Sequence, residues 1–274
     1  ISSGLVGSEM CIRDRITGAS AGIGHEIAKE FAAKKFNLIL VARREERLSV
    51  ISQDLAQKYN IEATYIVADL SDPSSPQMIY NKTHALGLNV EILVNNAGYS
   101  INKKFHSTDE LEEDNFLRVL GISVIHLTKL YLKDMLSKNS GRIMNVSSLA
   151  AFAPPATGWG AMYGPIKTFI NRFGDTININ YNSKGITATN VCPGFTVTEF
   201  HTASGMQDAM DKVPAIMKHD SKYVAKGAPF ATYLESCFII AGTLSIASCM
   251  PLAVWNSVTV NPGQTLVAVM PLEL

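Results

Sequence analysis

The chain has 274 residues, of which 47% are hydrophobic, so it can bury one large core and we expect a single domain. Its 24 basic and 24 acidic residues cancel, which excludes a strong net field that would recruit nucleic acid or an anionic membrane and favours a small-molecule ligand. The four cysteines are widely spaced, form no C-x-x-C pair and follow no cleavable secretory signal, so we expect a reducing, cytoplasmic compartment.

Residues 1–15 should contain the first strand, yet the stretch from Cys11 to Arg15 puts three charges where a central strand is normally apolar. We therefore predict a poor strand here. Two interpretations stay open. The stretch is either a genuine short N-terminus or, from Ser8 to Arg15, a segment that is not native to this fold and replaces its first strand.

From residue 16 onward, short apolar runs alternate with longer segments of helical period, a pattern typical of βαβ units that build a parallel sheet. Most runs are rich in Val, Ile and Leu, as expected for strands covered by helices on both faces. The predicted strands span residues 37–42, 63–68, 91–95, 142–147 and 187–192. The predicted helices begin near Gly22, Arg44, Ser75, Leu111 and Ala161. We predict one α/β domain over residues 16–235.

Residues 16–24 form a glycine-rich turn into a helix, with the spacing T-G-x-x-x-G-x-G. The glycines let the backbone approach a pyrophosphate at the positive helix N-terminus, although such a turn can also serve only to pack a helix onto a sheet. The spacing resembles the fingerprint of the short-chain dehydrogenase/reductase family, and the resemblance extends to Thr198. It implies a Rossmann-type, doubly wound parallel sheet that binds a dinucleotide. The implied contacts in the turn are Thr17, Gly18, Ser20, Gly22, Ile23 and Gly24.

The end of the second strand bears on the choice of cofactor. Ala42 occupies the position that carries an acid in NAD-using members of the family, and Arg43 follows it. Because the acid that would bind the ribose hydroxyls is missing and Arg43 can pair with a 2′-phosphate, we predict NADP(H). The alternative is that Arg43 only begins a solvated helix. Further cofactor contacts implied by the resemblance are Asp69 and, in the motif N-N-A-G, Asn96, Ala97 and Gly98.

Tyr163 and Lys167 are four residues apart in a segment of helical character, so they lie on one face about one turn from each other. A phenol normally has a pKa of ~10, and we predict that the Lys167 ammonium, with a positive nicotinamide ring, lowers the pKa of Tyr163. A tyrosine and a lysine at this spacing often occur together by chance. Here they resemble the family's catalytic pair, in which the tyrosine exchanges a proton with the substrate oxygen while hydride passes to or from the nicotinamide.

Ser148 is the second serine of a doublet that the family uses to hydrogen-bond the substrate carbonyl. The interval from Ser148 to Tyr163 is two residues longer than the family's usual spacing, which weakens this assignment. Leu120 is a second departure, because it stands where the family has an asparagine that holds a proton-relaying water beside the lysine. Leucine cannot bind water through its side chain, so the relay is built differently or turnover is impaired.

The segment after the sixth strand matches the family's P-G-x-x-x-T motif, which contacts the nicotinamide carboxamide; an ordinary turn is the alternative. The implied contacts are Pro193, Gly194, Thr196 and Thr198. Residues 199–220 then correspond to the family's variable substrate lid. Four apolar residues there would form one stripe if the segment were helical, with a kink at Pro214: Met206, Met210, Val213 and Met217. Such stripes usually pack a core, but Met206, Met210 and Trp159 could contact a hydrophobic substrate.

Residues 236–274 form an atypical apolar tail. The run from Cys237 to Trp255 is nearly long enough to span a bilayer, but Pro251 within it and the lack of flanking basic anchors favour a buried helix and strand, or a tail not native to the fold. Residues 257–260 could supply the last strand of the sheet.

These motifs predict an NADP(H)-dependent oxidoreductase that interconverts an alcohol and a carbonyl on a hydrophobic substrate such as a ketone, a 3-oxoacyl thioester or a steroid-like compound. No metal is implied, and a homodimer or homotetramer is expected by resemblance. Two alternatives stay open: a nucleotide-binding sensor or scaffold that has lost turnover, and an enzyme held at a membrane by the apolar tail.

Overall fold

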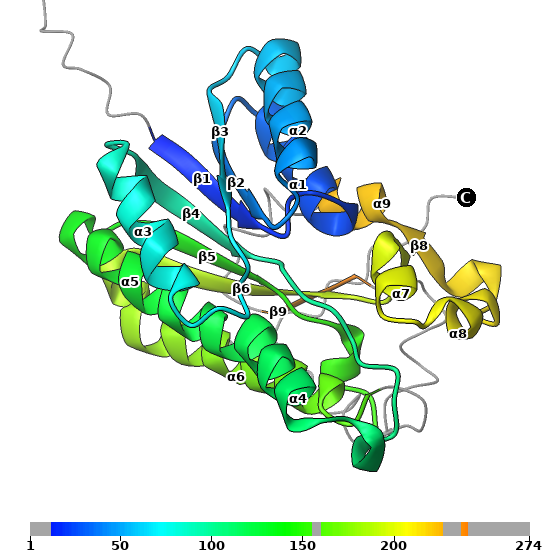
Figure 1. Ribbon diagram of the computed structural model, residues 1–274. Coiled ribbons are helices and arrows are strands. Elements are labelled where there is room, and N and C mark those ends of the chain that lie inside the picture. The colour runs from blue at the N-terminus through cyan, green and yellow to red at the C-terminus, as the bar shows by residue number, and fades with distance from the viewer. Residues whose placement is uncertain (1–11, 155–159, 227–236, 241–274) are drawn as a thin grey trace, which may run out of the picture.

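The computed structural model describes residues 12–154, 160–226 and 237–240 (Figure 1). Its centre is a seven-stranded parallel sheet in the order β3-β2-β1-β4-β5-β6-β9. The strands are β1 (Ile12–Thr17), β2 (Asn37–Ala42), β3 (Ala63–Val67), β4 (Asn89–Asn95), β5 (Gly141–Val146), β6 (Ile186–Pro193) and β9 (Cys237–Ile240). This is the doubly wound Rossmann-type arrangement expected from the sequence.

Helices cover both faces of the sheet and bury its apolar side chains (Figure 1). One face packs against α1 (Gly22–Ala33), α2 (Glu45–Tyr59) and α9 (Ser221–Lys226). The other packs against α3 (Ser75–Ala85), α5 (Ser123–Lys138) and α6 (Tyr163–Tyr181), with α4 (Glu110–Leu117) leading into α5. Because β1 pairs with β2 on one side and β4 on the other, the strand order reverses at β1. In such sheets the crevice at the carboxyl ends of the strands is the usual ligand site.

The predicted strands lie within two residues of the observed ones, because continuous apolar runs between polar turns are a strong signal for buried parallel strands. The first strand is the exception. The charged stretch forms β1 at the centre of the sheet, in parallel register with β2 and β4. Its Asp14 and Arg15 are fully buried, so tertiary structure overrides an unfavourable local sequence.

Residues 199–220, which the resemblance assigned to a substrate lid and which we call the lid segment, are not one helix. The lid segment contains α7 (Glu199–Ala203), α8 (Gln207–Asp211), a 3-10 turn (Ala215–Met217) and β8 (Lys218–Asp220), which pairs with β7 (Phe195–Val197). The condition for one apolar stripe, a helical segment, is therefore not met. A proline lacks the backbone N–H that a helix interior needs, and Pro214 immediately precedes the 3-10 turn.

The sequence placed the last strand at residues 257–260, which lie outside the described residues. The strand beside β6 is instead β9, at the start of the apolar tail. Four residues of the run that was considered as a membrane span are thus an edge strand of the sheet. Within the part of the chain that the structure describes, no helix is long and apolar enough to cross a membrane.

Candidate active site

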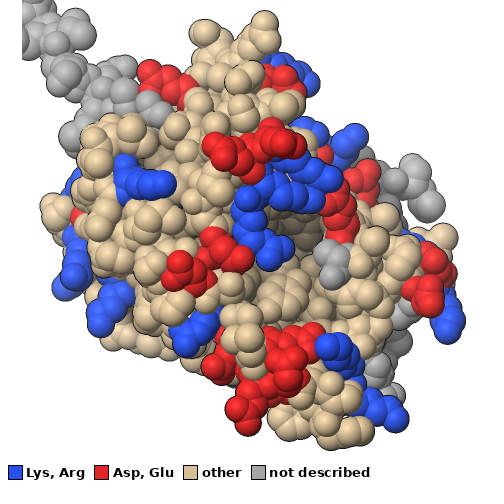
Figure 2. Space-filling model, in the orientation of Figure 1, with Lys and Arg blue, Asp and Glu red and all other residues tan. Residues whose placement is uncertain are grey.

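A cavity of about 1090 Å³ lies at the carboxyl ends of the central strands. Figure 2 shows it as a hollow with basic side chains along part of its rim. Most of the residues that the sequence singled out line it: Gly18, Ser20, Gly22, Ile23, Arg43, Asp69, Asn96, Ala97, Gly98, Ser148, Tyr163, Lys167, Pro193, Gly194, Thr196 and Thr198. Thr17, Gly24, Met206 and Met210 are absent from its lining, and Trp159 lies outside the described residues.

The glycine turn between β1 and α1 leaves no room for larger side chains. Gly18 and Gly22 have φ angles of +65° and +55°, which side chains disfavour. A Cβ atom on Gly24 would lie 2.5 Å from the carbonyl oxygen of Gly18, and one on Gly22 would lie 3.2 Å from Thr198. α1 begins without a side-chain cap, so the N–H groups of its first turn are free of side-chain acceptors. The turn can therefore accept an anion at close range.

Thr17 and Asn96 hold the glycine turn against the end of β4. The Thr17 hydroxyl donates to the carbonyl of Val94 (3.2 Å) and accepts from the backbone N–H groups of Asn96 (2.9 Å) and Ala97 (3.2 Å). The Asn96 amide donates to the carbonyl of Thr17 at 2.9 Å. Thr17 and Gly24, which the sequence assigned as cofactor contacts, thus lie behind the cavity wall and support the turn.

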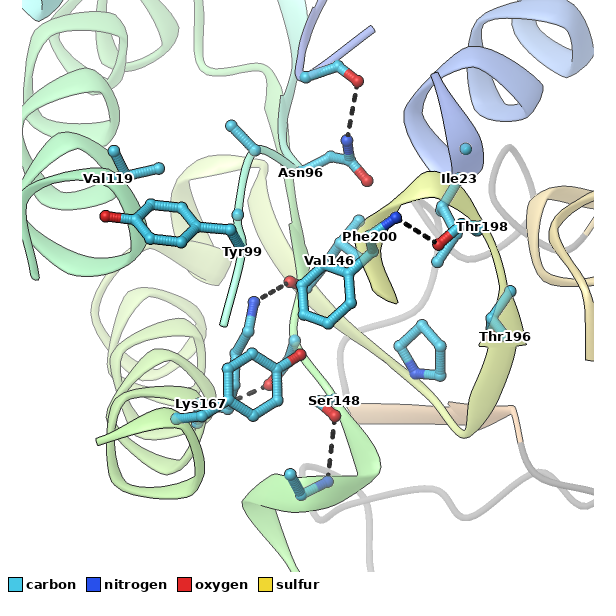
Figure 3. A pocket seen from close by; sticks show the side chains of 18 of the residues that line it. Ile23, Asn96, Tyr99, Val119, Val146, Ser148, Lys167, Thr196, Thr198 and Phe200 are labelled. Atoms are coloured by element: carbon cyan, nitrogen blue, oxygen red, sulfur yellow. Dashed lines mark hydrogen bonds between the residues drawn. The ribbon is translucent and has the colours of Figure 1, made fainter. Parts of the chain in front are cut away.

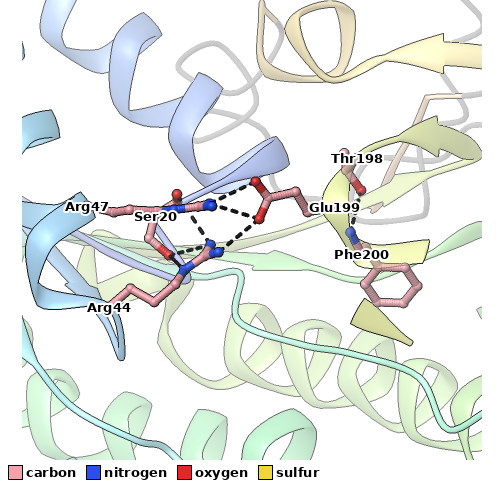
Figure 4. Close-up of polar contacts among 6 residues, drawn as sticks. All are labelled: Ser20, Arg44, Arg47, Thr198, Glu199 and Phe200. Carbon is pink, nitrogen blue, oxygen red and sulfur yellow. Dashed lines mark hydrogen bonds and ion pairs between the residues drawn. The ribbon is translucent and has the colours of Figure 1, made fainter. Parts of the chain in front are cut away.

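Two arginines at the start of α2 behave differently. Arg43 is largely exposed and lies 3.8 Å from Asp69. Arg44 instead reaches back to the glycine turn, where its Nη2 donates to the Ser20 hydroxyl at 3.0 Å, and across to Glu199 at the start of α7 (3.0 Å; Figure 4). The sequence did not indicate the contact between Arg44 and Glu199, because no local pattern links residues so far apart in the chain.

Tyr163 and Lys167 begin α6 and are both buried (8% and 6% exposed). The Lys167 ammonium donates to the carbonyl of Val146 at 2.8 Å and lies 5.7 Å from the centre of the Tyr163 ring (Figure 3). The Ser148 hydroxyl hydrogen-bonds the Tyr163 phenol and accepts from the N–H of Ala150 at 3.1 Å. The structure therefore brings all three predicted catalytic residues together, despite the longer interval between Ser148 and Tyr163.

The charges at this site differ from the sequence-based expectation. Burial raises the pKa of Tyr163 to about 12, and the hydrogen bond from Ser148 offsets only part of this effect. Burial also lowers the pKa of Lys167 to about 8. The prediction that Lys167 lowers the pKa of the phenol does not hold for the chain by itself, because burial is the main influence on the pKa of Tyr163 and raises it. At neutral pH the phenol is therefore protonated.

Leu120 lies in a π-helical turn (Arg118–Ile122) between α4 and α5 and is 1% exposed. It packs in one apolar cluster with Phe116 and Tyr163. A Cβ atom on Gly98 would lie 3.6 Å from its Cγ atom. Apolar atoms therefore occupy the position where the family's asparagine was expected, and the wall behind Tyr163 is apolar on this side.

The lid segment contributes two cavity residues, Phe200 and His201, that the sequence did not indicate. The Phe200 ring lies 5.8 Å from the ring of Tyr163, and its N–H donates to the Thr198 hydroxyl, which caps α7. His201 is 6% exposed, and burial lowers its pKa. Met206 and Met210 are buried elsewhere in the lid and pack as core residues. The available signal in the sequence was their position, because Phe200 and His201 are aromatic residues that closely follow Thr198.

No group of three or more His, Cys, Asp or Glu side chains within the described residues is arranged to hold a metal ion. The polar groups that face the cavity are hydroxyls, amides, one ammonium, the guanidinium groups at its rim, the His201 imidazole and the carboxylates of Asp69 and Glu199. Both carboxylates lie within ion-pair distance of a rim arginine, and the remaining donors suit an anionic organic ligand.

Comparison with known proteins agrees with the fold. The family model described as "short chain dehydrogenase" matches residues 15–209. The very-long-chain 3-oxoacyl-CoA reductase of Anas platyrhynchos is 32% identical over 195 residues, which is 69% of this chain and 61% of the relative. The human reductase of that name is 30% identical, over 67% of this chain and 59% of its own length. The chain thus spans about 60% of the length of these relatives.

Solved structures show the same architecture. The short-chain dehydrogenase from Sphingobium yanoikuyae, in complex with NADPH, aligns with a TM-score of 0.77 and 23% identity over 90% of each chain. The L-sorbose reductase of Gluconobacter frateurii, complexed with NADPH and L-sorbose, aligns with a TM-score of 0.73 and 23% identity, over 86% of this chain and 98% of that one. At these identities the likeness concerns the fold.

Proposed function

Because the chain belongs to the short-chain dehydrogenase family, we propose that it is an NADP(H)-dependent oxidoreductase that interconverts an alcohol and a carbonyl. One observation carries the proposal. The Tyr163 phenol meets the Ser148 hydroxyl and the Lys167 ammonium inside the cavity that the glycine turn also lines.

The cavity fits a dinucleotide in its shape and in its donors. The glycine turn and the uncapped N-terminus of α1 suit a diphosphate, and the rim arginines suit a further phosphate. NADP(H) bound there would supply the hydride or accept it. The residues that we propose to hold it at the cavity wall are Gly18, Ser20, Gly22, Ile23, Arg43, Asp69, Asn96, Ala97, Gly98, Pro193, Gly194, Thr196 and Thr198.

Tyr163 serves as the general acid in the direction of reduction. With a pKa of about 12, its phenol keeps its proton at neutral pH and can give it to a carbonyl oxygen that is gaining negative charge. Ser148 accepts from the N–H of Ala150, which leaves its own proton to point at the phenol or at the substrate oxygen. Lys167 keeps two of its three protons free of Val146 and stabilises the phenolate that remains.

We further propose a hydrophobic substrate, and among the classes considered we favour a 3-oxoacyl thioester. The relatives from Anas platyrhynchos and human described above are very-long-chain 3-oxoacyl-CoA reductases. The cavity beside Tyr163 is lined by apolar side chains, which suit an acyl chain. They are Leu149, Ala150, Ala153, Pro154, Phe195 and Phe200.

Oxidation of NADPH by the purified chain tests the proposal, with ketones and 3-oxoacyl thioesters of increasing length as substrates. We expect Tyr163→Phe to lower kcat by roughly 10²–10⁴, the usual contribution of a positioned general acid. Tyr181→Phe, at the far end of the same helix, is the matched control and should keep the wild-type rate. Turnover at the wild-type level in Tyr163→Phe would refute the assignment.

The alternative of a nucleotide-binding sensor or scaffold without turnover rested on Leu120, on the long interval before Tyr163 and on the atypical sequence at both ends of the chain. We do not favour it, because Ser148, Tyr163 and Lys167 are in contact or close proximity across that interval. NADPH binding measured by calorimetry, with no oxidation on any substrate of the panel, would restore it.

For assembly, we propose a homodimer or homotetramer that pairs through α5 and α6. Phe169 and Ile179 on α6 are 43% and 84% exposed, and Ile122 just before α5 is 38% exposed. Exposed apolar side chains on neighbouring helices are typical of an interface between copies. Sedimentation equilibrium of the full chain measures the subunit number.

A further inference from the structure

Four side chains from three distant segments meet at the rim of the cavity (Figure 4). Ser20 lies in the glycine turn, Arg44 and Arg47 lie at the start of α2, and Glu199 begins α7. Arg44 donates to the Ser20 hydroxyl (3.0 Å) and to Glu199 Oε2 (3.0 Å). Arg47 donates to both carboxylate oxygens of Glu199, at 2.8 and 3.0 Å. The contacts join the lid to the cofactor half of the domain.

The cluster is built as an anion site that already holds an anion. Two guanidinium groups converge on one point, and the Glu199 carboxylate occupies it. The Ser20 hydroxyl holds Arg44 in place by accepting from its Nε and Nη2. Hydrogen bonds from Arg47 and Arg44 hold the pKa of Glu199 below its usual range, so this carboxylate is charged at neutral pH. Ser20, Arg44 and Glu199 also line the cavity, so a ligand in the cavity can reach them.

We propose that Glu199 is an internal competitor for the 2′-phosphate of NADP(H): its carboxylate occupies the site between Arg44 and Arg47, and a phosphate that binds there displaces it and releases α7. This inference rests on the proposed function, in which the cavity binds a dinucleotide. It makes Glu199 a specificity-determining residue, because its carboxylate opposes NADP(H) and leaves NAD(H), which lacks the 2′-phosphate, unaffected.

The strengths of the two interactions favour this exchange. Arg44, Arg47 and Glu199 are 44%, 49% and 53% exposed, and exposed ion pairs contribute only ~0–1 kcal/mol each. A phosphate monoester carries about −1.5 to −2 charges and three strong acceptor oxygens, so it pairs with two guanidinium groups better than a carboxylate does. The phosphate therefore wins the site, at an affinity reduced by the carboxylate that it must displace.

The exchange has a consequence for the lid. α7 carries Phe200, whose ring lies 5.8 Å from the ring of Tyr163, and follows Thr198, which approaches Gly22. Loss of the two ion pairs detaches the start of α7 from α2. We therefore expect the 2′-phosphate to loosen the element that lies over the proposed catalytic tyrosine, which couples recognition of the cofactor to access for the substrate.

Calorimetry with adenosine 2′,5′-bisphosphate and with 5′-AMP tests the competition directly, because the two probes differ only in the 2′-phosphate. We expect Glu199→Gln to bind the bisphosphate about three- to tenfold more tightly than the wild type, the range that exposed ion pairs support. Its affinity for 5′-AMP should stay within about twofold. Glu46→Gln, which removes an exposed negative charge on the same turn of α2, is the matched control and should change neither affinity.

Unchanged or weaker binding of the bisphosphate by Glu199→Gln overturns the proposal and shows that Glu199 orients the arginines for the ligand or does nothing. The proposed function fails in a distinguishable way. If wild-type chain binds neither the bisphosphate nor NADPH, the cofactor assignment and this inference fall together. If it binds and oxidises NADPH while Glu199→Gln behaves as wild type, only the inference falls.

Amide hydrogen exchange reports the release of α7 without any turnover. In the wild type, the bisphosphate should speed exchange at Phe200, His201 and Thr202 relative to 5′-AMP. In Glu199→Gln these amides should already exchange fast with either probe, because a neutral amide replaces the carboxylate that tethers them. Equal exchange in wild type with both probes would mean that the phosphate binds without displacing Glu199.

Discussion

Two groups of polar side chains are buried in the same central sheet, on opposite sides of the strand-order reversal, and the fold treats them differently. On β1, Asp14 and Arg15 are fully buried, and neither has a hydrogen-bond partner of good geometry among the described residues. On β4, β5 and β6, the amides of Asn95, Asn145 and Asn190 are also buried but bond to one another. Both groups are buried, but only the second forms hydrogen bonds between its own side chains.

The asparagine ladder exists because the three residues occupy one register of the parallel sheet. Asn95 donates to Asn145 at 3.0 Å, Asn145 donates to Asn190 at 3.1 Å, and Asn190 donates to the carbonyl of Asn171 on α6 at 3.0 Å. α6 also carries Tyr163. The ladder therefore ties the strands beneath the proposed catalytic group to the helix that presents it.

β1 shows the opposite case. The Asp14 carboxyl lies near the acidic Glu91, and burial is the main reason that its pKa is raised well above the usual range. The Arg15 guanidinium stacks on the ring of Tyr131 at 4.4 Å, which compensates part of its lost hydration. An unpaired buried charge costs several kcal/mol in a protein interior, so β1 forms through pairing with β2 and β4 in spite of these side chains.

The largest effect should come from removing the middle amide of the ladder. Asn145→Leu leaves the Asn190 side-chain oxygen without its donor and the Asn95 amide with only its longer bond to the Thr128 hydroxyl (3.4 Å). Each unsatisfied buried group costs ~1–3 kcal/mol, so we expect the free energy of unfolding to fall by about 2–4 kcal/mol. Urea denaturation measures it. Asn180→Leu, on the exposed side of α6, is the control. A loss below ~0.5 kcal/mol would show that the ladder adds no stability and would remove the contrast with β1.

The second effect, smaller and of opposite sign, should come from β1. Replacing buried charges by apolar side chains of similar volume stabilises proteins by ~1–4 kcal/mol in favourable cases, so we expect Asp14→Val with Arg15→Met to raise the free energy of unfolding by about 2 kcal/mol. The control is Arg142→Met, which breaks the 2.6 Å ion pair with Glu91 and should lower stability slightly. If the double variant is less stable than the wild type, the β1 charges have partners that contribute to folding.

The same two regions explain what could be predicted from the sequence. β2 and β4 to β6 were predictable because apolar runs bounded by polar turns have one stable arrangement in a parallel sheet. β1 was predicted to be poor because three charges contradict that pattern, and only pairing on both sides makes it a strand. β9 was missed, because in an apolar tail without turn signals nothing fixes which four residues pair with β6.

The residues of the candidate site also fall into those that the sequence could predict and those that it could not. Tyr163, Lys167 and Ser148 were predictable because each lies in a short motif that resembles the family's, and Ser148 lies beside the phenol despite the longer interval. The asparagine ladder and the contact of Glu199 with Arg44 depend on register between strands or on contacts across 155 residues, which spacing along the chain does not encode. The raised pKa of Tyr163 was missed for a related reason, because burial can be judged only in the folded chain.

The smallest effect, and the one most specific to β1, is a dependence of stability on pH. Burial raises the pKa of Asp14 in the folded chain, whereas in the unfolded chain it stays near ~3.9. Between these two values the folded state binds more protons, so the free energy of unfolding falls as pH rises, by at most ~1.4 kcal/mol per pH unit. Asp14→Asn cannot titrate, so we expect the wild type to lose stability relative to it from about pH 4 upward, followed by urea denaturation at successive pH values. Parallel curves for the two proteins would mean that Asp14 is ionised in the folded chain and has found a partner, which would make β1 resemble the ladder.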